Sequence, residues 1–303
     1  MELPTPLERV PGAIAEFVGR DDLWLKREDL NELGMFKWRA ALPVVASFVG
    51  DGSSVVVTSS TGNHGSAVAW ACRQTDAQAI VFVPPGATPA KLELLERLGA
   101  EVRVAGADLD EAKDAARAWA AGKELPFFED GAEPLQYDAY GAIGDEIVDQ
   151  SPSSPAAIVV PVGNGALAGG IGAAVGRRAP GIVRIGVVAG AMPVMAASYE
   201  MGEPVDVPTR STIADGLAVR VAIPLAVERL STTVDRMLRV SERGLSDALV
   251  ACHDAGVLVE PSAAAAVAAV RDHPDLAPDG PVVLVMTGRN VDPGVLERAR
   301  TAS

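Results

Sequence analysis

Short apolar runs alternate with longer alanine-rich segments along this 303-residue chain, and this alternation constrains the fold more than any other feature. Each apolar run ends in turn residues, and the segment after it has helical periodicity. The runs are "SVVVTSS", "AIVFVPP", "EVRVAG", "AAIVVPVG", "VRIGVVAG" and "PVVLVMTG". Because parallel strands need helical crossovers, the sequence predicts an α/β fold made of two doubly wound, mostly parallel sheet lobes.

Charge and hydropathy narrow the choice of partner. The formal net charge is −14 and no basic run occurs, so a nucleic-acid backbone is disfavoured as a partner and a small molecule is favoured. The opening "MELPTPLERVPG" lacks the pattern of a leader, and the apolar runs are too short for a membrane span. We therefore expect a soluble, cytoplasmic protein with no membrane partner. Cys72 and Cys252 are expected to be small core residues.

Ligands of open α/β sheets gather at the carboxyl ends of strands, so the loops after the apolar runs are the candidate sites. In "VVVTSSTGNHGSAV", a strand is followed by residues 59–65 and then directly by a helix. Hydroxyl groups and backbone N–H groups at a helix N-terminus suit a carboxylate, although serine, threonine and asparagine are also ordinary helix caps.

Two later loops have the same position. The glycine-rich residues 163–167 lie between a strand and a helix, where they fit a phosphate cradle, a loose dinucleotide fingerprint or close strand–helix packing. Thr287 ends the last apolar run, and its hydroxyl suits a cofactor ring nitrogen or an ordinary turn.

Lys37 follows "LGMF" and precedes a helix start. A lysine in an apolar setting favours its neutral amine, which Schiff-base chemistry with an aldehyde cofactor requires. The alternative is a surface lysine whose stem covers apolar residues.

In this order the loops resemble those of the fold-type II pyridoxal-phosphate enzymes, the group of serine/threonine dehydratase, serine racemase and threonine synthase. The stretch "MFKWRAA" is similar to the family motif S-F-K-x-R-G-A, "STGNHG" to S-S-G-N-H-G, "VGNGALAGGI" to the phosphate loop and "MTGRN" to the ring-nitrogen motif. The stretches "TIADGLAV" and "LVEPSAAAAVAAV" also agree, and the resemblance spans residues 5–293.

The resemblance implies the tryptophan synthase beta-like fold, with pyridoxal 5'-phosphate in the cleft between the lobes. Lys37 would carry the cofactor as a Schiff base and would also be catalytic. The other cofactor-binding residues it implies are Phe36 and Asn63 at the ring, Gly163, Asn164, Gly165, Ala166 and Leu167 at the phosphate, Thr287 at the ring nitrogen, and Glu260 at the border of the site.

The resemblance also assigns the substrate side. Ser60, Thr61, Asn63 and His64 would bind the carboxylate of a small amino acid, and Thr61 falls where racemase-like members exchange protons. Residues 1–50 with 138–303 would form the large cofactor-binding domain, and residues 51–137 the small mobile domain on the substrate side. We expect a homodimer by the same resemblance, and no C-terminal regulatory domain.

The expected activity is that of a lyase: β- or γ-elimination from a small amino acid, as in serine/threonine dehydratases or threonine synthases. A β-replacement that makes a non-standard amino acid is the alternative, and racemisation is a third. Trp38, Ala40 and Thr61 depart from the common motifs and leave the substrate open. The segment "GVVAGAMPV" has no carboxylate where racemase-like members bind a divalent cation, so we expect no metal there. A dinucleotide-dependent oxidoreductase is disfavoured because no acidic residue ends "VRIGVVAG".

Overall fold

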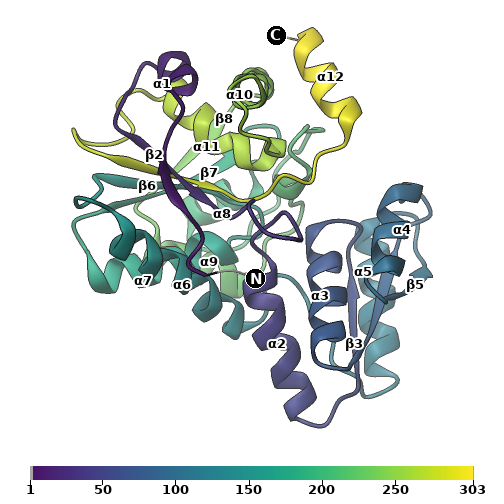
Figure 1. Ribbon diagram of the computed structural model, residues 1–303. Helices are drawn as coiled ribbons and strands as arrows, with labels where there is room; N and C mark the ends of the chain where they lie inside the picture. The colour runs from purple at the N-terminus through teal and green to yellow at the C-terminus, as the bar shows by residue number, and fades with distance from the viewer. Residues whose placement is uncertain (1–2, 303) are drawn as a thin grey trace. The chain divides into compact units, whose positions relative to one another are not determined.

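The structure is a computed structural model that describes residues 3–302 (Figure 1). The chain forms two compact units. The larger unit comprises the described residues up to Phe36 and those from Tyr140 onward, and the smaller unit comprises Lys37–Ala139.

The larger unit is built on a six-stranded sheet in the order β1-β2-β9-β6-β7-β8. Only the edge strand β1 is antiparallel to its neighbour, and the other pairings are parallel. The strands are β1 (Leu7–Arg9), β2 (Leu23–Arg27), β6 (Ala157–Pro161), β7 (Val183–Ala189), β8 (Arg236–Val240) and β9 (Val282–Met286). The central strands β6 and β9 are buried along their whole length, because helices cover both faces of a parallel sheet.

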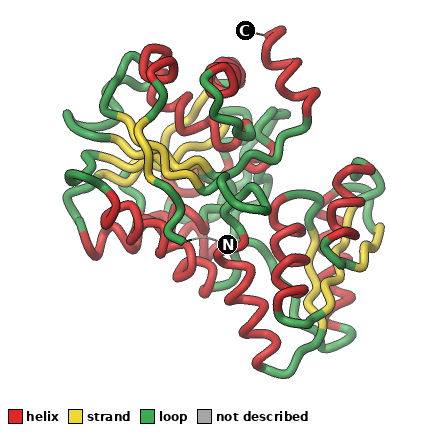
Figure 2. The backbone as a smooth tube through the Cα atoms, in the orientation of Figure 1, coloured by secondary structure: helices red, strands yellow, loops and turns green. Residues whose placement is uncertain are grey.

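Helices lie on both faces of this sheet, as the red and yellow segments of Figure 2 show. In Figure 1, α1, α10 and α11 lie over one face, and α7 and α9 over the other. The bounds are α1 (Gly12–Val18), α6 (Pro134–Gln150), α7 (Ala166–Arg178), α8 (Val194–Met201), the 3-10 helix η1 (Asp215–Leu217), α9 (Pro224–Thr233), α10 (Glu242–Asp254), α11 (Pro261–Asp272) and α12 (Pro293–Ala302). Residues 134–139 of α6 belong to the smaller unit. The alanine run at residues 263–266 lies in α11, where small side chains allow residues 261–270 of the helix to be buried.

The smaller unit is a three-stranded parallel sheet in the order β3-β4-β5, with helices packed on it. Its elements are α2 (Trp38–Gly50), β3 (Val55–Ser59), α3 (Asn63–Gln74), β4 (Gln78–Val83), α4 (Pro89–Arg97), β5 (Glu101–Val104) and α5 (Leu109–Ala121). After α5 the chain returns alongside β3, where Val57 N–H donates to the Pro126 carbonyl and Phe128 N–H donates to the Val57 carbonyl. We call residues 126–128 the return strand, because their hydrogen bonds extend alongside β3.

The predicted fold class is confirmed, and the six predicted apolar runs become β3, β4, β5, β6, β7 and β9. The division into units differs from the expected one in residues 37–50 and, at the other boundary, in residues 138–139, which also group with the smaller unit. We expected them in the large domain, but α2 packs against α3 and groups with the smaller unit. Across the described residues, each helix is too short or too polar to cross a bilayer.

Glycine brings α7 close to α9 in the larger unit. A Cβ atom at Gly172 would lie 2.3 Å from the Thr233 carbonyl oxygen at the end of α9. Such a contact is far inside van der Waals distance, so the backbones approach as closely as they do only because residue 172 has no side chain.

We predict that Gly172→Ala lowers the free energy of unfolding by about 2 kcal/mol or more, because α9 must move away from α7. The urea unfolding midpoint of the purified variant measures this effect. Gly12→Ala is the matched control, because a Cβ atom at Gly12 would have no neighbour within 4 Å. Equal midpoints for the two variants would contradict the prediction.

Candidate active site

The glycine-rich loop of the larger unit connects β6 to α7. Gly165 has φ +101° and directly precedes the first residue of α7, and a Cβ atom at Gly163 would lie 2.4 Å from the Gly216 carbonyl oxygen. The Ala166 N–H donates to Asn164 Oδ1 at 3.1 Å, so the loop is held by its own asparagine. The first-turn N–H groups of a helix favour an anion, and here glycines shape the turn that leads into them.

Thr287 directly follows β9. Its carbonyl accepts a hydrogen bond from Phe36 N–H at 3.0 Å, which fixes Phe36 beside this strand end. The Thr287 side chain is buried, and its Oγ1 has no hydrogen-bond partner among the described residues. A buried hydroxyl without a partner is costly, so this hydroxyl is a candidate to pair with a polar atom of a ligand.

Glu260 lies against the same strand end. Its N–H donates to the Gly288 carbonyl at 2.9 Å, and a Cβ atom at Gly288 would lie 2.9 Å from Glu260 Oε1. Ser262, two residues further on, also has a buried Oγ without a partner among the described residues, and a Cβ atom at Gly216 would lie 2.7 Å from it. The larger unit therefore brings the loop at 163–167, Glu260 and Thr287 together through close approaches at Gly163, Gly216 and Gly288.

The smaller unit carries the other predicted residues at the N-terminus of α3. Asn63 and His64 are the first two residues of α3, and the Gly62 N–H donates to Ser60 Oγ at 3.1 Å. His64 Nε2 lies 3.2 Å from the Phe128 carbonyl oxygen and donates to it, so the return strand at 126–128 fixes the ring. Residues 60–62 and the first turn of α3 therefore lie together at the carboxyl end of β3.

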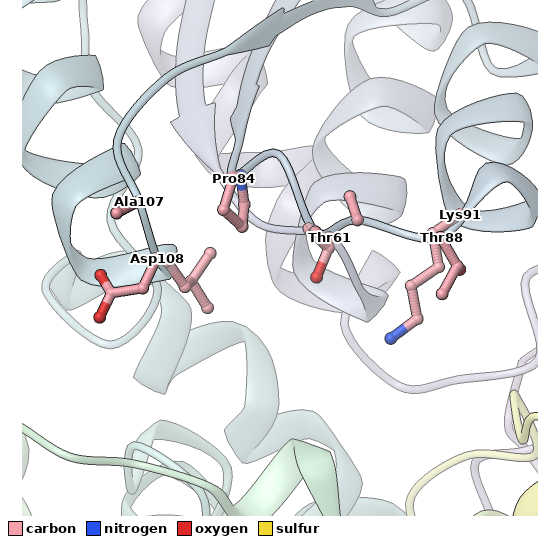
Figure 3. A pocket seen from close by; sticks show the side chains of 9 residues that line it. Thr61, Pro84, Thr88, Lys91, Ala107 and Asp108 are labelled. Atoms are coloured by element: carbon pink, nitrogen blue, oxygen red, sulfur yellow. The ribbon is translucent and has the colours of Figure 1, made fainter.

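Thr61 lies in the same loop but lines a pocket of the smaller unit. The pocket has a volume of about 260 Å³. Figure 3 shows Thr61 and Lys91 extending toward the same open space. The residues that line it are Thr61, Pro84, Gly86, Ala87, Thr88, Lys91, Ala107, Asp108 and Leu109. Thr61 can therefore contact a ligand in a pocket that residues of the smaller unit form by themselves.

Lys37 caps the N-terminus of α2, as the sequence predicts, but its surroundings differ from the expected apolar setting. Its Nζ donates to Asp130 Oδ2 at 2.5 Å, and both side chains are about one-fifth exposed. The expected apolar setting is thus incomplete, because the Lys37 amine is paired with a carboxylate.

Asp130 is held ionised. Burial would raise the pKa of this carboxyl, but the charge of Lys37, the nearby His64, and hydrogen bonds from Lys37 and Gln136 outweigh burial and bring the pKa well below its usual range. His64 Nδ1 lies 3.7 Å from Asp130 Oδ1. Burial lowers the pKa of His64, only partly offset by Asp130, so this ring is neutral at pH 7.

Asp130, Gln136 and Ser262 were not predicted from the sequence. Asp130 lies within "LPFFEDG", residues 125–131, where a short apolar run ends in polar residues, as at the predicted strand ends. The return strand is parallel to β3, so residues 129–130 fall at the same sheet edge as the loop before α3. Treating this run as a strand would have identified Asp130. Ser262 follows the helix-starting proline of α11 and has no comparable signal in the sequence.

The family model described as pyridoxal-phosphate dependent enzyme matches residues 1–288. The L-threonine ammonia-lyase of Thermotoga maritima is 33% identical over 279 residues, which cover 91% of this chain and 69% of that protein. Among solved structures, the processed form of threonine deaminase isoform 2 from Solanum lycopersicum superposes with a TM-score of 0.91 at 26% identity, covering 99% of this chain and 88% of that one. Maize serine racemase gives 0.88 at 26% identity, covering 98% and 91%.

The chain therefore belongs to the pyridoxal-phosphate dependent enzymes. It has the tryptophan synthase beta-like fold of these relatives, and it is a pyridoxal-phosphate-dependent lyase that acts on a small amino acid by elimination. The residues present fit the cofactor. A lysine amine, a glycine-shaped helix start and a buried hydroxyl without a partner match its aldehyde, its phosphate and its ring nitrogen in chemical type.

The Asp130 pKa predicts how the stability of the cofactor-free protein depends on pH. Since the pKa of this carboxyl is lower in the folded chain than the value of about 3.9 for an unfolded one, the unfolded chain binds the proton first as pH falls. The stabilisation is therefore complete above the unfolded pKa and is lost as pH falls toward the folded one. We predict that the difference in free energy of unfolding between wild type and Asp130→Asn persists at neutral pH and shrinks below roughly pH 4. Urea unfolding at a series of pH values measures it, and a difference that is independent of pH would contradict it.

Proposed function

We propose that the protein deaminates L-threonine, L-serine or both, forming ammonia and the matching 2-oxo acid. The carrying observation is the buried Thr287 hydroxyl without a partner, supported by the 33% identity to a threonine ammonia-lyase. A neutral hydroxyl at the ring nitrogen leaves that nitrogen unprotonated, so the ring withdraws electrons weakly. Loss of a β-leaving group is then favoured over long-lived carbanions and transamination.

We assign the cofactor-binding roles as follows. Lys37 holds the aldehyde carbon covalently, and the loop at 163–167 binds the phosphate through backbone N–H groups. Phe36 flanks the ring, Asn63 bonds its 3' oxygen, Thr287 faces its nitrogen, and Glu260 borders the site. The assignment is supported by the glycine-shaped start of α7 and by the hydrogen bond that fixes Phe36 to Thr287.

The substrate carboxylate binds, in this proposal, to Ser60, Thr61, Asn63 and His64. The N-terminus of α3 supplies backbone N–H groups and a favourable dipole for an anion. His64 is buried and neutral, with its Nε2 proton engaged by the Phe128 carbonyl, so it positions the loop and does not supply charge.

The chemistry then depends on the chain's own base. When bound, pyridoxal phosphate withdraws electrons from the substrate Cα and so acidifies the α-proton. The substrate amine takes the place of Lys37 at the aldehyde carbon, which frees the Lys37 amine to take that proton. The C–H electron pair remains on the substrate and expels the β-hydroxyl, which leaves as water with the proton that Lys37 accepted. The resulting enamine tautomerises and is hydrolysed, giving a 2-oxo acid and ammonia. The water lost in the elimination is regained in the hydrolysis.

Three finer assignments go with this proposal. We expect a homodimer, a question that light scattering after gel filtration answers. We also expect the protein to work in the cytoplasm and to have no nucleic-acid partner.

The function is tested by incubating the holoenzyme separately with L-threonine, L-serine and their O-acyl and O-phosphoryl forms, and by measuring ammonia, 2-oxo acid and enantiomer content. We predict equal amounts of ammonia and 2-oxo acid with a free hydroxy amino acid, and loss of both in Lys37→Ala. Lys123→Ala is the matched control, because Lys123 is an exposed lysine in the same unit. Turnover of only the activated forms with an added thiol would indicate β-replacement instead, and a D-amino acid without ammonia would indicate racemisation.

A further inference from the structure

The Asp130 carboxylate is fixed from several sides within the smaller unit. Its Oδ2 accepts from Lys37 Nζ at 2.5 Å, and its Oδ1 accepts from Gln136 Nε2 at 3.0 Å. The Gln136 amide oxygen in turn accepts from the Gly131 N–H at 2.7 Å, and Gln136 is buried. A carboxylate held through both oxygens has little rotational freedom, so it presents Oδ2 to the lysine in one orientation.

The backbone around Asp130 is equally constrained. The Phe128 carbonyl accepts from Thr58 Oγ1 at 2.8 Å and from the His64 ring, and the Phe128 ring packs edge-on against His64 with centroids 4.8 Å apart. These contacts connect the return strand to β3 and to the start of α3. Asp130 therefore occupies a defined position beside the loop that precedes α3.

To form a covalent bond with an aldehyde, a lysine must be a neutral amine, and a carboxylate at hydrogen-bond distance does not favour that form. The proton transfer has the opposite requirement. An amine that removes a proton becomes an ammonium, and a fixed negative charge beside it stabilises that product and the transition state leading to it. The pairing of Lys37 with Asp130 fits the second requirement.

We infer that Asp130 is a positioning residue for the proton transfer: it orients the Lys37 amine and stabilises the ammonium that forms when this amine takes the α-proton. The inference rests on the proposed function for the identity of the base. In the step, the proton moves from Cα to Nζ and the C–H electron pair stays on the substrate. Asp130 remains ionised throughout and neither gains nor loses a proton.

The test compares Asp130→Asn with the matched variant Glu129→Gln. Asparagine keeps the size and one oxygen acceptor of Asp130 but removes its charge. Glu129 is the neighbouring carboxylate, and its partners are Lys113 at 3.4 Å and Arg117 at 2.7 Å, so Glu129→Gln removes the same charge one residue away. Both variants are first titrated, cofactor-free, with pyridoxal phosphate, and the visible band of the bound cofactor is recorded.

For Asp130→Asn we expect cofactor affinity within about threefold of wild type, kcat lower by at least about tenfold, and little change in KM. Because proton transfer becomes slower relative to the other steps, the kinetic isotope effect with α-deuterated substrate should rise above the wild-type value. Glu129→Gln should match wild type in all four measurements.

Two results would overturn the inference. One is a kcat for Asp130→Asn within about twofold of wild type with an unchanged isotope effect. The other is a loss of activity that follows loss of bound cofactor, which would assign Asp130 to cofactor retention. Failure of the proposed function is separate: if wild type releases no 2-oxo acid, exchange of the α-proton with D₂O, followed by NMR, still compares the variants. Equal exchange rates in wild type and Asp130→Asn would then refute the inference alone.

Discussion

Parallel strand pairing is the constraint on which the candidate site depends, because it brings the carboxyl ends of the parallel strands to one edge of their sheet. In the smaller unit this edge carries the loop before α3 and, through the return strand at 126–128, Asp130. In the larger unit it carries the loop before α7 and the Thr287 strand end. Backbone pairing thus places residues that are far apart in sequence at the same edge of each sheet, without the help of a ligand.

Within that frame, charge pairing decides how the lysine is used. The run "LGMF" before Lys37 indicates an apolar environment, yet the amine hydrogen-bonds to a carboxylate that stays ionised. An ionised carboxylate beside an amine favours the charged form of the amine, whereas apolar surroundings favour its neutral form. A base that gains a positive charge during its reaction therefore benefits from the carboxylate.

The polar gaps in the larger unit have a complementary meaning. The hydroxyls of Thr287 and Ser262 are buried without partners among the described residues, and glycines at 163, 216 and 288 leave room where a Cβ atom would collide. Buried polar groups normally have hydrogen-bond partners, so two unpartnered hydroxyls near these glycines indicate a surface that binds a polar ligand. The cofactor of this family has acceptor atoms to which such hydroxyls can donate.

The sequence predicted the fold class and the strand-end loops well, because buried parallel strands are continuous apolar runs and their ends carry turn residues. It did not reveal β1, β2 or β8, where charged residues interrupt the pattern, as in "LWLKR" and "RMLRV". Asp130 was missed for a related reason: residues 126–128 are too short for a periodicity signal, and their strand character comes from pairing with β3. The placement of α2 depends on packing against α3, a tertiary contact that no local pattern encodes.

The central claim is that Lys37 is the residue that bonds covalently to the cofactor. Reduction of the holoenzyme with borohydride, followed by proteolysis and mass spectrometry, tests it directly. The account predicts a single pyridoxyl-modified peptide that contains Lys37. Modification of Lys26, Lys91, Lys113 or Lys123 in its place, or no modified lysine in a coloured holoenzyme, would contradict it.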